Sequence, residues 1–313
     1  MNTRVLIVDD ELNLLRSLQR NLRGKFDLTI AEGGVAGMAQ ILEGGPFGVI
    51  VSDLRMPEID GLQVLGMARL IAPDTFRVML TGNVSSQIAQ HGQTSNPWFQ
   101  YVGKPCTTEA LCAVLNEGFD RYEMATSAKR LKSQTVNEVG LPQSHRTLRG
   151  AVARCRRLRQ LARRFGDEMN PSETWQYELA GLLSQLSRFV SVADSERPEH
   201  IDVHDEAFQR KQAEVSSRII REIPRLEQIA DMVGHRYADE FQPTVPDCVR
   251  MGTQILRIIL DFDILTDALS EAEAITKMKE RSKYYGASLF LSFSEFISRV
   301  PMRRSNEPCL QAN

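Results

Sequence analysis

Five polar residues follow short apolar runs in the first third of the sequence. They are Asp9, Asp10, Asp53, Thr81 and Lys104. The adjacent carboxylates Asp9 and Asp10 offer hard oxygen ligands, which suit Mg²⁺ because this ion keeps several waters and takes few protein ligands. Asp53 can attack phosphorus to form an acyl phosphate, while an ammonium and a hydroxyl can meet the incoming phosphoryl oxygens. These residue types therefore predict phosphoryl transfer to Asp53 with Mg²⁺ as cofactor.

Alternating strands and helices must position these residues. Short apolar runs predict strands at 4–8, 26–30, 49–51, 77–80 and 98–102. Apolar residues at helical spacing predict helices between the strands, near 14–22, 35–43 and 62–70. This alternation is typical of an α/β doubly wound sheet of five parallel strands, in which ligands bind beyond the carboxyl ends of the strands. We therefore expect the five polar residues to converge at one edge of the sheet.

The motifs around these residues resemble the receiver domain of two-component response regulators. The resemblance covers residues 3–122 and rests on Asp9-Asp10-Glu11, Ser52-Asp53-Leu54-Arg55-Met56-Pro57, Asp60-Gly61, Leu80-Thr81-Gly82 and Lys104-Pro105. It implies a flavodoxin-like fold in which Asp53 accepts a phosphoryl group from a sensor histidine kinase. It also implies that Mg²⁺ is held by Asp9, Asp10, Asp53 and the backbone carbonyl of Arg55. In the same resemblance Thr81 and Lys104 bind the phosphate, and Tyr101 is the aromatic switch residue.

The sequence from residue 109 onward predicts an almost entirely helical structure. A helix over 109–122 has a pattern that runs on toward Leu131, and a break with Gly140 and Pro142 follows. Further helices are expected at 148–165, 173–190, 206–222, 224–236, 246–268 and 271–280. We therefore divide the chain into a receiver domain at 1–122, a helical linker at 123–145, an output domain at 146–300 and a disordered tail at 301–313.

Residues 145–296 resemble the HD-GYP phosphodiesterases. The resemblance rests on the segment 181–188, on Ile223-Pro224-Arg225-Leu226-Glu227 and on Asp263-Ile264-Leu265-Thr266. In the register that it implies, the metal-binding positions of the family hold Gly150, Ser184, Gln185, Gln212 and Leu260. A hydrogen, a hydroxyl, amides and an isobutyl group cannot hold a metal or activate water. The resemblance therefore implies an all-α, HD-like output domain that binds no metal, is not an enzyme and signals through a downstream protein partner.

Two other output functions stay open. One is an active cyclic di-GMP phosphodiesterase that uses unorthodox metal ligands. The other is nucleic-acid binding through residues 121–165, where arginine and lysine far outnumber acidic residues. No aromatic residue interleaves the arginines and no helix-turn-helix pattern is visible, so nucleic acid is the less favoured partner. A basic face balanced by acids elsewhere in the chain is the preferred interpretation.

Two further expectations concern the interior and the route of the signal. Asp261 and Asp263 alternate within an apolar helix, so at most one of them should face inward. The resemblance to receiver domains implies that phosphorylation alters the face made by the last receiver strand and the helix from Glu109, and the unbroken helical pattern links this face to the second half of the chain. That face is a common dimer surface in the receiver family. We therefore expect a change in self-association, with a homodimer as one form, or in the angle between the halves.

Composition and cysteine usage bear on the location of the protein. The 313 residues carry a net charge of −2, and no run of about 18 apolar residues that could span a membrane is present. The five cysteines are odd in number and show no paired spacing, which indicates reduced thiols rather than disulfides or a zinc site. We therefore expect a cytoplasmic protein that does not associate with membranes.

Overall fold

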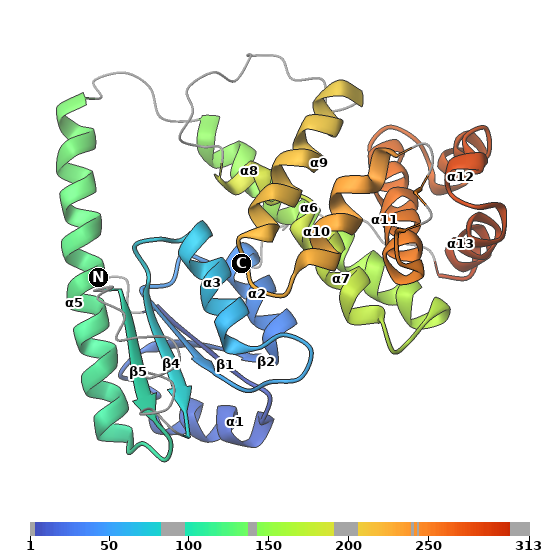
Figure 1. The fold of residues 1–313 in the computed structure, drawn as a ribbon. Coiled ribbons are helices and arrows are strands. Elements are labelled where there is room, and N and C mark those ends of the chain that lie inside the picture. Colours follow the sequence, from blue (N-terminus) through green and yellow to red (C-terminus); the bar gives the residue numbers. More distant parts are fainter. Residues whose placement is uncertain are drawn as a thin grey trace, which may run out of the picture.

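The computed structural model describes residues 4–82, 98–136, 143–190, 206–238, 241–242 and 244–300, and within it the side chains of 128–136, 143–149 and 190 are left undescribed. A parallel sheet with flanking helices is followed by a body made of helices (Figure 1). Among the described residues, no helix combines the length and apolar character needed to cross a membrane. Residues 301–313, for which a disordered tail is predicted, lie outside the described residues.

The sheet has five parallel strands in the order β2-β1-β3-β4-β5. They are β1 (Arg4–Asp9), β2 (Asp27–Glu32), β3 (Val49–Asp53), β4 (Phe76–Thr81) and β5 (Phe99–Gly103). The central strands β3 and β4 are buried along their whole length, whereas the edge strands are partly exposed. Buried parallel strands are covered on both faces, which explains their continuous apolar sequences. The predicted doubly wound α/β fold is confirmed.

Two pairs of helices cover the two faces of the sheet. On one face lie α1 (Leu12–Asn21) and α5 (Thr108–Val136), and their buried leucines share a core with the strands. On the other face lie α2 (Gly34–Glu43) and α3 (Gly61–Ile71). A capping box between Asp60 and Gln63 starts α3. Helix α5 continues through the first part of the predicted linker at 123–145, and residues 137–142 lie outside the described residues.

The helical body begins with α6 (Gln143–Met169), α7 (Thr174–Leu183) and α8 (Ser187–Val190). It continues with α9 (Glu206–Arg221), α10 (Glu227–Gly234), the short helix η2 (His235–Tyr237) and α11 (Asp247–Leu265), and ends with α12 (Glu271–Lys279), η3 (Ser282–Tyr284) and α13 (Ala287–Arg299). The predicted helix 173–190 is in fact two helices, because a turn follows Leu183. Helix α13 was not predicted, although Phe290, Phe293 and Phe296 have helical spacing and are buried in its inner face.

The helical body packs on the face of the sheet that α2 and α3 cover. One continuous apolar core joins that face to α6, α7 and α10, and it includes Met38, Leu42, Leu158 and Ile223. Figure 1 shows α2 and α3 between the sheet and the helical body, while α5 runs along the opposite side of the sheet. The contact between the halves therefore lies on the α2–α3 face, whereas the change expected on phosphorylation concerns the β5–α5 face.

Candidate functional site

Three of the predicted site residues meet at the carboxyl edge of the sheet. Asp9 ends β1, Asp53 ends β3, and Lys104 follows β5. The Nζ atom of Lys104 lies 2.7 Å from Asp9 Oδ2 and 2.6 Å from Asp53 Oδ1. Burial alone would lower the pKa of Lys104, but hydrogen bonds to Asp53 and Asp9 and their negative charges raise it. One protonated ammonium thus bridges two carboxylates that would otherwise repel each other.

Backbone groups hold the two carboxylates in place. The N–H of Arg55 donates to Asp53 Oδ2 at 2.7 Å, and the N–H of Glu11 donates to Asp9 Oδ1 at 2.9 Å. Gly61 lies directly against β3, where an added Cβ would be 2.1 Å from the backbone oxygen of Asp53. Only glycine allows this close approach, which places the start of α3 beside the candidate phosphoacceptor.

The other predicted receiver residues lie around this group at different depths. Thr81 is buried at the end of β4, and its backbone oxygen accepts a hydrogen bond from the N–H of Lys104 at 2.8 Å. Asp10 and Arg55 are exposed beside the buried Asp9 and Asp53. Tyr101 is half-buried on the edge strand β5, in edge-to-face contact with Phe99, and burial raises the pKa of its phenol.

The donor chemistry of this edge fits a magnesium ion. No three His, Cys, Asp or Glu side chains among the described residues form a group arranged to hold a metal. Magnesium depends less on such a group, because it keeps several waters and takes few protein ligands. Asp9 and Asp53 present hard oxygens at one edge, with the exposed Asp10 adjacent. When bound, Mg²⁺ would neutralise phosphoryl oxygens.

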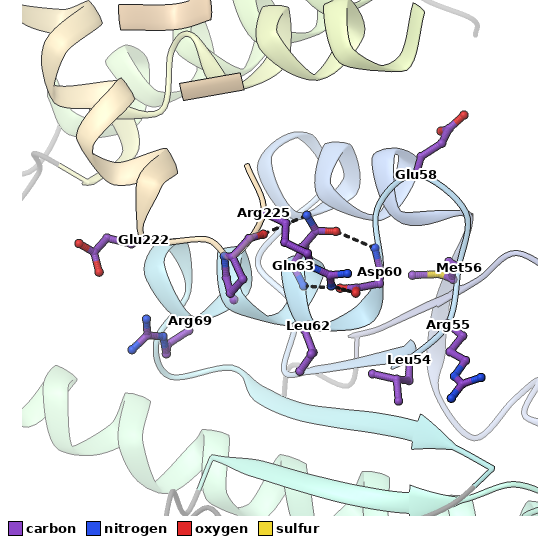
Figure 2. Close-up of a pocket in the computed structure, with 12 residues that line it drawn as sticks. Leu54, Arg55, Met56, Glu58, Asp60, Leu62, Gln63, Arg69, Glu222 and Arg225 are labelled. Atoms are coloured by element: carbon purple, nitrogen blue, oxygen red, sulfur yellow. Dashed lines mark hydrogen bonds and ion pairs between the residues drawn. The ribbon is translucent and has the colours of Figure 1, made fainter. Parts of the chain in front are cut away.

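The loop that follows Asp53 contacts the helical body directly. Asp60 forms an ion pair with Arg225, and Gln63 Nε2 donates to the backbone oxygen of Pro224 at 3.0 Å (Figure 2). A cleft of about 1000 Å³ lies here, lined from the receiver side by residues between Leu54 and Arg69 and from the other side by Glu222, Pro224 and Arg225. No local pattern in the sequence predicts these contacts, because the partners lie more than 160 residues apart.

Ion pairs of Arg159, which we call the arginine clamp, form a second contact between the receiver domain and the helical body. Arg159 on α6 contacts Glu43 on α2 through Nε at 2.8 Å and Glu178 on α7 through Nη1 at 2.8 Å. The side chains of Glu43 and Glu178 are each only 6% exposed. Buried carboxylates need a cationic partner, and Glu43 finds its partners, Arg159 and Arg156, only across the interface among the described residues.

These ion pairs also show what the arginines of the basic segment 121–165 contact. Arg154 and Arg157 lie 3.0 and 2.8 Å from the carboxylate of Asp263. Arg156, Arg159 and Arg163 also pair with acidic side chains, so five arginines of this segment lie beside acids of the same chain. This supports the interpretation of a basic face balanced within the chain.

The two aspartates on α11 differ in burial and in their partners. Asp263 is buried among arginines, as described above, and its neighbour Asp261 accepts a hydrogen bond from the Tyr285 hydroxyl at 2.7 Å. The two side chains are only 7% and 12% exposed. Of the two, only Asp263 is buried and Asp261 is intermediate, which agrees with the expectation that at most one of them faces inward.

Five residues occupy the positions that correspond to metal ligands in the HD-GYP resemblance, and we call them the degenerate HD positions. Four of them line one small cavity in the helical body. Ser184 and Gln185 reach the cavity from the turn after α7, Gln212 from α9 and Leu260 from α11. Gly150 does not line the cavity but is exposed one helical turn before Arg154, which does. Arg188 and Arg236 also line this cavity, and no motif in the sequence predicted that they would.

Comparison with known proteins identifies the first part of the chain. The family described as response regulator receiver domain matches residues 5–116. The hydrogenase transcriptional regulatory protein HoxA of Bradyrhizobium diazoefficiens is 29% identical over 120 residues, which cover 38% of this chain and 24% of that protein. Residues 5–116 therefore form a response regulator receiver domain, the regulated module of two-component systems. The matched part spans only 24% to 28% of the length of the first curated relatives.

Solved structures also resemble this part of the chain. The crystal structure of adenylate cyclase from Rhodopirellula baltica is 36% identical, covering 42% of this chain and 98% of that one, with a TM-score of 0.38. The CheY-like receiver domain protein from Methanospirillum hungatei is 26% identical, covering 40% of this chain and 99% of that one, with a TM-score of 0.35. Both resemblances cover less than half of this chain.

Proposed function

We propose that this chain is a response regulator that a sensor histidine kinase phosphorylates on Asp53. The observation that carries the proposal is the convergence of Asp9, Asp53 and Lys104 at one edge of the receiver sheet. In the reaction, an oxygen of Asp53 bonds to phosphorus while the bond from phosphorus to the kinase histidine breaks. Lys104 then exchanges its contact with the Asp53 carboxylate for the new phosphoryl oxygens, and Thr81 donates its hydroxyl to one of them. Mg²⁺, held by Asp9, Asp10, Asp53 and the Arg55 carbonyl, would supply charge neutralisation.

The second part of the proposal is a route from Asp53 to the helical body. Arg55, whose N–H donates to Asp53 Oδ2, lies in the loop that ends at Asp60, the N-cap of α3, and Gln63 follows in the first turn of that helix. A phosphoryl group adds roughly one to two negative charges at this carboxylate, so it changes the partners of the Arg55 N–H. The loop then transmits the change to Pro224 and Arg225 through the contacts in Figure 2.

Backbone conformation supports this route. Among the described residues, two that are not glycine have positive φ, Glu58 at 63° and Arg225 at 62°. They lie on opposite sides of the same interface, one in the receiver loop and one in the turn before α10. Such conformations cost about 1–3 kcal/mol and persist only where surrounding contacts enforce them. A change in those contacts therefore releases local strain on both sides.

The third part of the proposal concerns the output. The helical body is a catalytically silent, HD-GYP-like domain that acts by contacts with a downstream protein. The supporting observation is that Ser184, Gln185, Gln212 and Leu260 gather at one place, as the register of that resemblance requires. The side chains at that place offer no imidazole, carboxylate or thiolate among the described lining residues.

We expect the purified chain to carry no stoichiometric iron or manganese and to leave cyclic di-GMP intact. The reason is that an amide, a hydroxyl and an isobutyl group do not bind such metals. Metal analysis of protein isolated from cells and a nucleotide hydrolysis assay check this. A transition metal at one equivalent, or turnover that disappears in Asp263→Asn, would establish the phosphodiesterase alternative instead.

A further inference from the structure

The first turn of α3 is closed by a capping box, and both members of this box also contact the helical body. Within the box, Asp60 Oδ1 accepts a hydrogen bond from the N–H of Gln63 at 3.1 Å, and Gln63 Oε1 accepts one from the N–H of Asp60 at 2.9 Å. The second carboxylate oxygen of Asp60 pairs with Arg225, and Gln63 Nε2 donates to the backbone oxygen of Pro224 (Figure 2). The contacts that start α3 are therefore shared between the receiver domain and the helical body.

The turn that supplies Pro224 and Arg225 is itself held in place. Ile223 is fully buried in the apolar core that joins the two halves. Its side chain lies close to α3, since a Cβ added to Gly66 would be 3.8 Å from Ile223 Cγ2. Arg225 has a φ of 62°, a conformation that persists only where surrounding contacts enforce it. The turn can therefore act as a fixed support for the start of α3.

The same end of α3 lies against the candidate phosphoacceptor. The N–H of Gly61 donates to the backbone oxygen of Leu54 at 3.1 Å, and a Cβ at Gly61 would lie 2.1 Å from the backbone oxygen of Asp53. Arg55, in the loop that leads to α3, donates its N–H to Asp53 Oδ2 at 2.7 Å. A shift of the first turn of α3 therefore moves the backbone beside Asp53.

We propose that Arg225 of the helical body is a positioning residue for the receiver site. Through Asp60 and the start of α3, it keeps the loop after Asp53 in the conformation in which the Arg55 carbonyl and the Asp53 carboxylate bind Mg²⁺. Influence then runs from the helical body to the receiver site as well as in the opposite direction, because the coupling of two binding equilibria is reciprocal. A protein that binds the helical body and moves this turn would change the affinity of the receiver for Mg²⁺. This inference rests on the proposed function of the receiver site.

The test measures Mg²⁺ binding to the unphosphorylated full chain by titration calorimetry, with the metal alone as the ligand. Arg225→Met removes the ion pair, whereas Arg225→Lys keeps a cation. Asp60→Asn also removes the pair but leaves a good N-cap residue at the start of α3. The control is Arg221→Met at the end of α9, which removes the same charge from a pair with Asp231 that lies entirely within the helical body.

We expect Arg225→Met to raise the dissociation constant for Mg²⁺ about threefold, within the range that a mostly exposed ion pair contributes. Loss of a positive charge by itself would strengthen Mg²⁺ binding, so weaker binding reports lost positioning. Arg225→Lys should restore part of the affinity, and Arg221→Met should bind no more weakly than the wild type. Asp60→Asn combined with Arg225→Met should bind no more weakly than the weaker single variant, because both changes remove the same interaction.

Hydrogen exchange in EDTA gives a second measurement that needs no metal. Amides at 54–63 should exchange faster in Arg225→Met than in the wild type or in Arg221→Met, because the loop loses its support. Equal dissociation constants and equal exchange in the wild type and Arg225→Met, with labelling of Asp53 intact, would overturn this inference and leave the proposed function standing. A wild-type chain that neither binds Mg²⁺ nor becomes labelled would overturn both.

Discussion

Replacing Asp53 by asparagine will abolish formation of an acyl phosphate from a small phosphodonor and Mg²⁺. An amide cannot act as the nucleophile, and among the described residues Asp53 is the acid that ends β3 beside Lys104. Asp10→Ala should reduce labelling without abolishing it, because it removes one candidate ligand of the metal while the nucleophile stays. The measurement is acid-labile phosphate incorporation, followed by gel shift or mass spectrometry.

A matched control keeps this result specific. Asp27→Asn makes the same chemical change on an exposed acid at the start of β2, at the opposite end of the strands. We expect it to be labelled like the wild type. Phosphate that persists at the wild-type level in Asp53→Asn would show that another residue is the acceptor.

Arg159→Met should destabilise the chain by about 3 kcal/mol, the lower end of the range for breaking a buried ion pair. The change removes the shared partner of two carboxylates that are almost fully buried, Glu43 and Glu178. The lower end applies because Arg159 is itself 19% exposed and Glu43 keeps a contact with Arg156. Denaturant unfolding monitored by circular dichroism gives the free energy.

Arg163→Met is the matched control for this prediction. Arg163 lies on the same helix and faces the same Glu178, but it is 62% exposed and 3.6 Å away. Exposed pairs contribute about 0–1 kcal/mol, so this variant should change stability little. Adding Glu43→Gln to Arg159→Met should restore part of the loss, because the second change removes the unpaired buried charge. Equal losses of unfolding free energy in Arg159→Met and Arg163→Met would mean that the ion pairs of Arg159 do not stabilise the contact between the receiver domain and the helical body.

The receiver fold was predictable because short stretches of sequence are enough to identify each strand and helix. Each buried strand is a continuous apolar run, and the residues that follow the strands, such as Asp53 and Lys104, must meet at one edge of a parallel sheet. Helix boundaries were accurate where a stop signal exists, as at Gly44, which follows α2. The roles of Asp10, Thr81 and Tyr101 remain predictions, although their positions in the fold are now known.

The contact between the halves was not predictable for a physical reason. Asp60 and Arg225, or Glu43 and Arg159, are unremarkable charged residues on helices and turns, and nothing local distinguishes them from solvated ones. Their pairing depends on which face of the sheet the helical body covers. No pattern in the sequence identified that face, and the body packs on α2 and α3. A homodimer through the α5 face remains a separate prediction.

Hydrogen exchange with a beryllofluoride phosphate mimic and Mg²⁺ tests the central claim, that phosphorylation of Asp53 acts on the helical body through the β3–α3 loop. In the wild type, amides at 54–63 and 222–227 should change their exchange rate together on addition of the mimic, and in Asp53→Asn neither segment should respond. Changes in both segments of the wild type alone are the predicted result. A response confined to β5 and α5, with 222–227 unaffected, would contradict the claim.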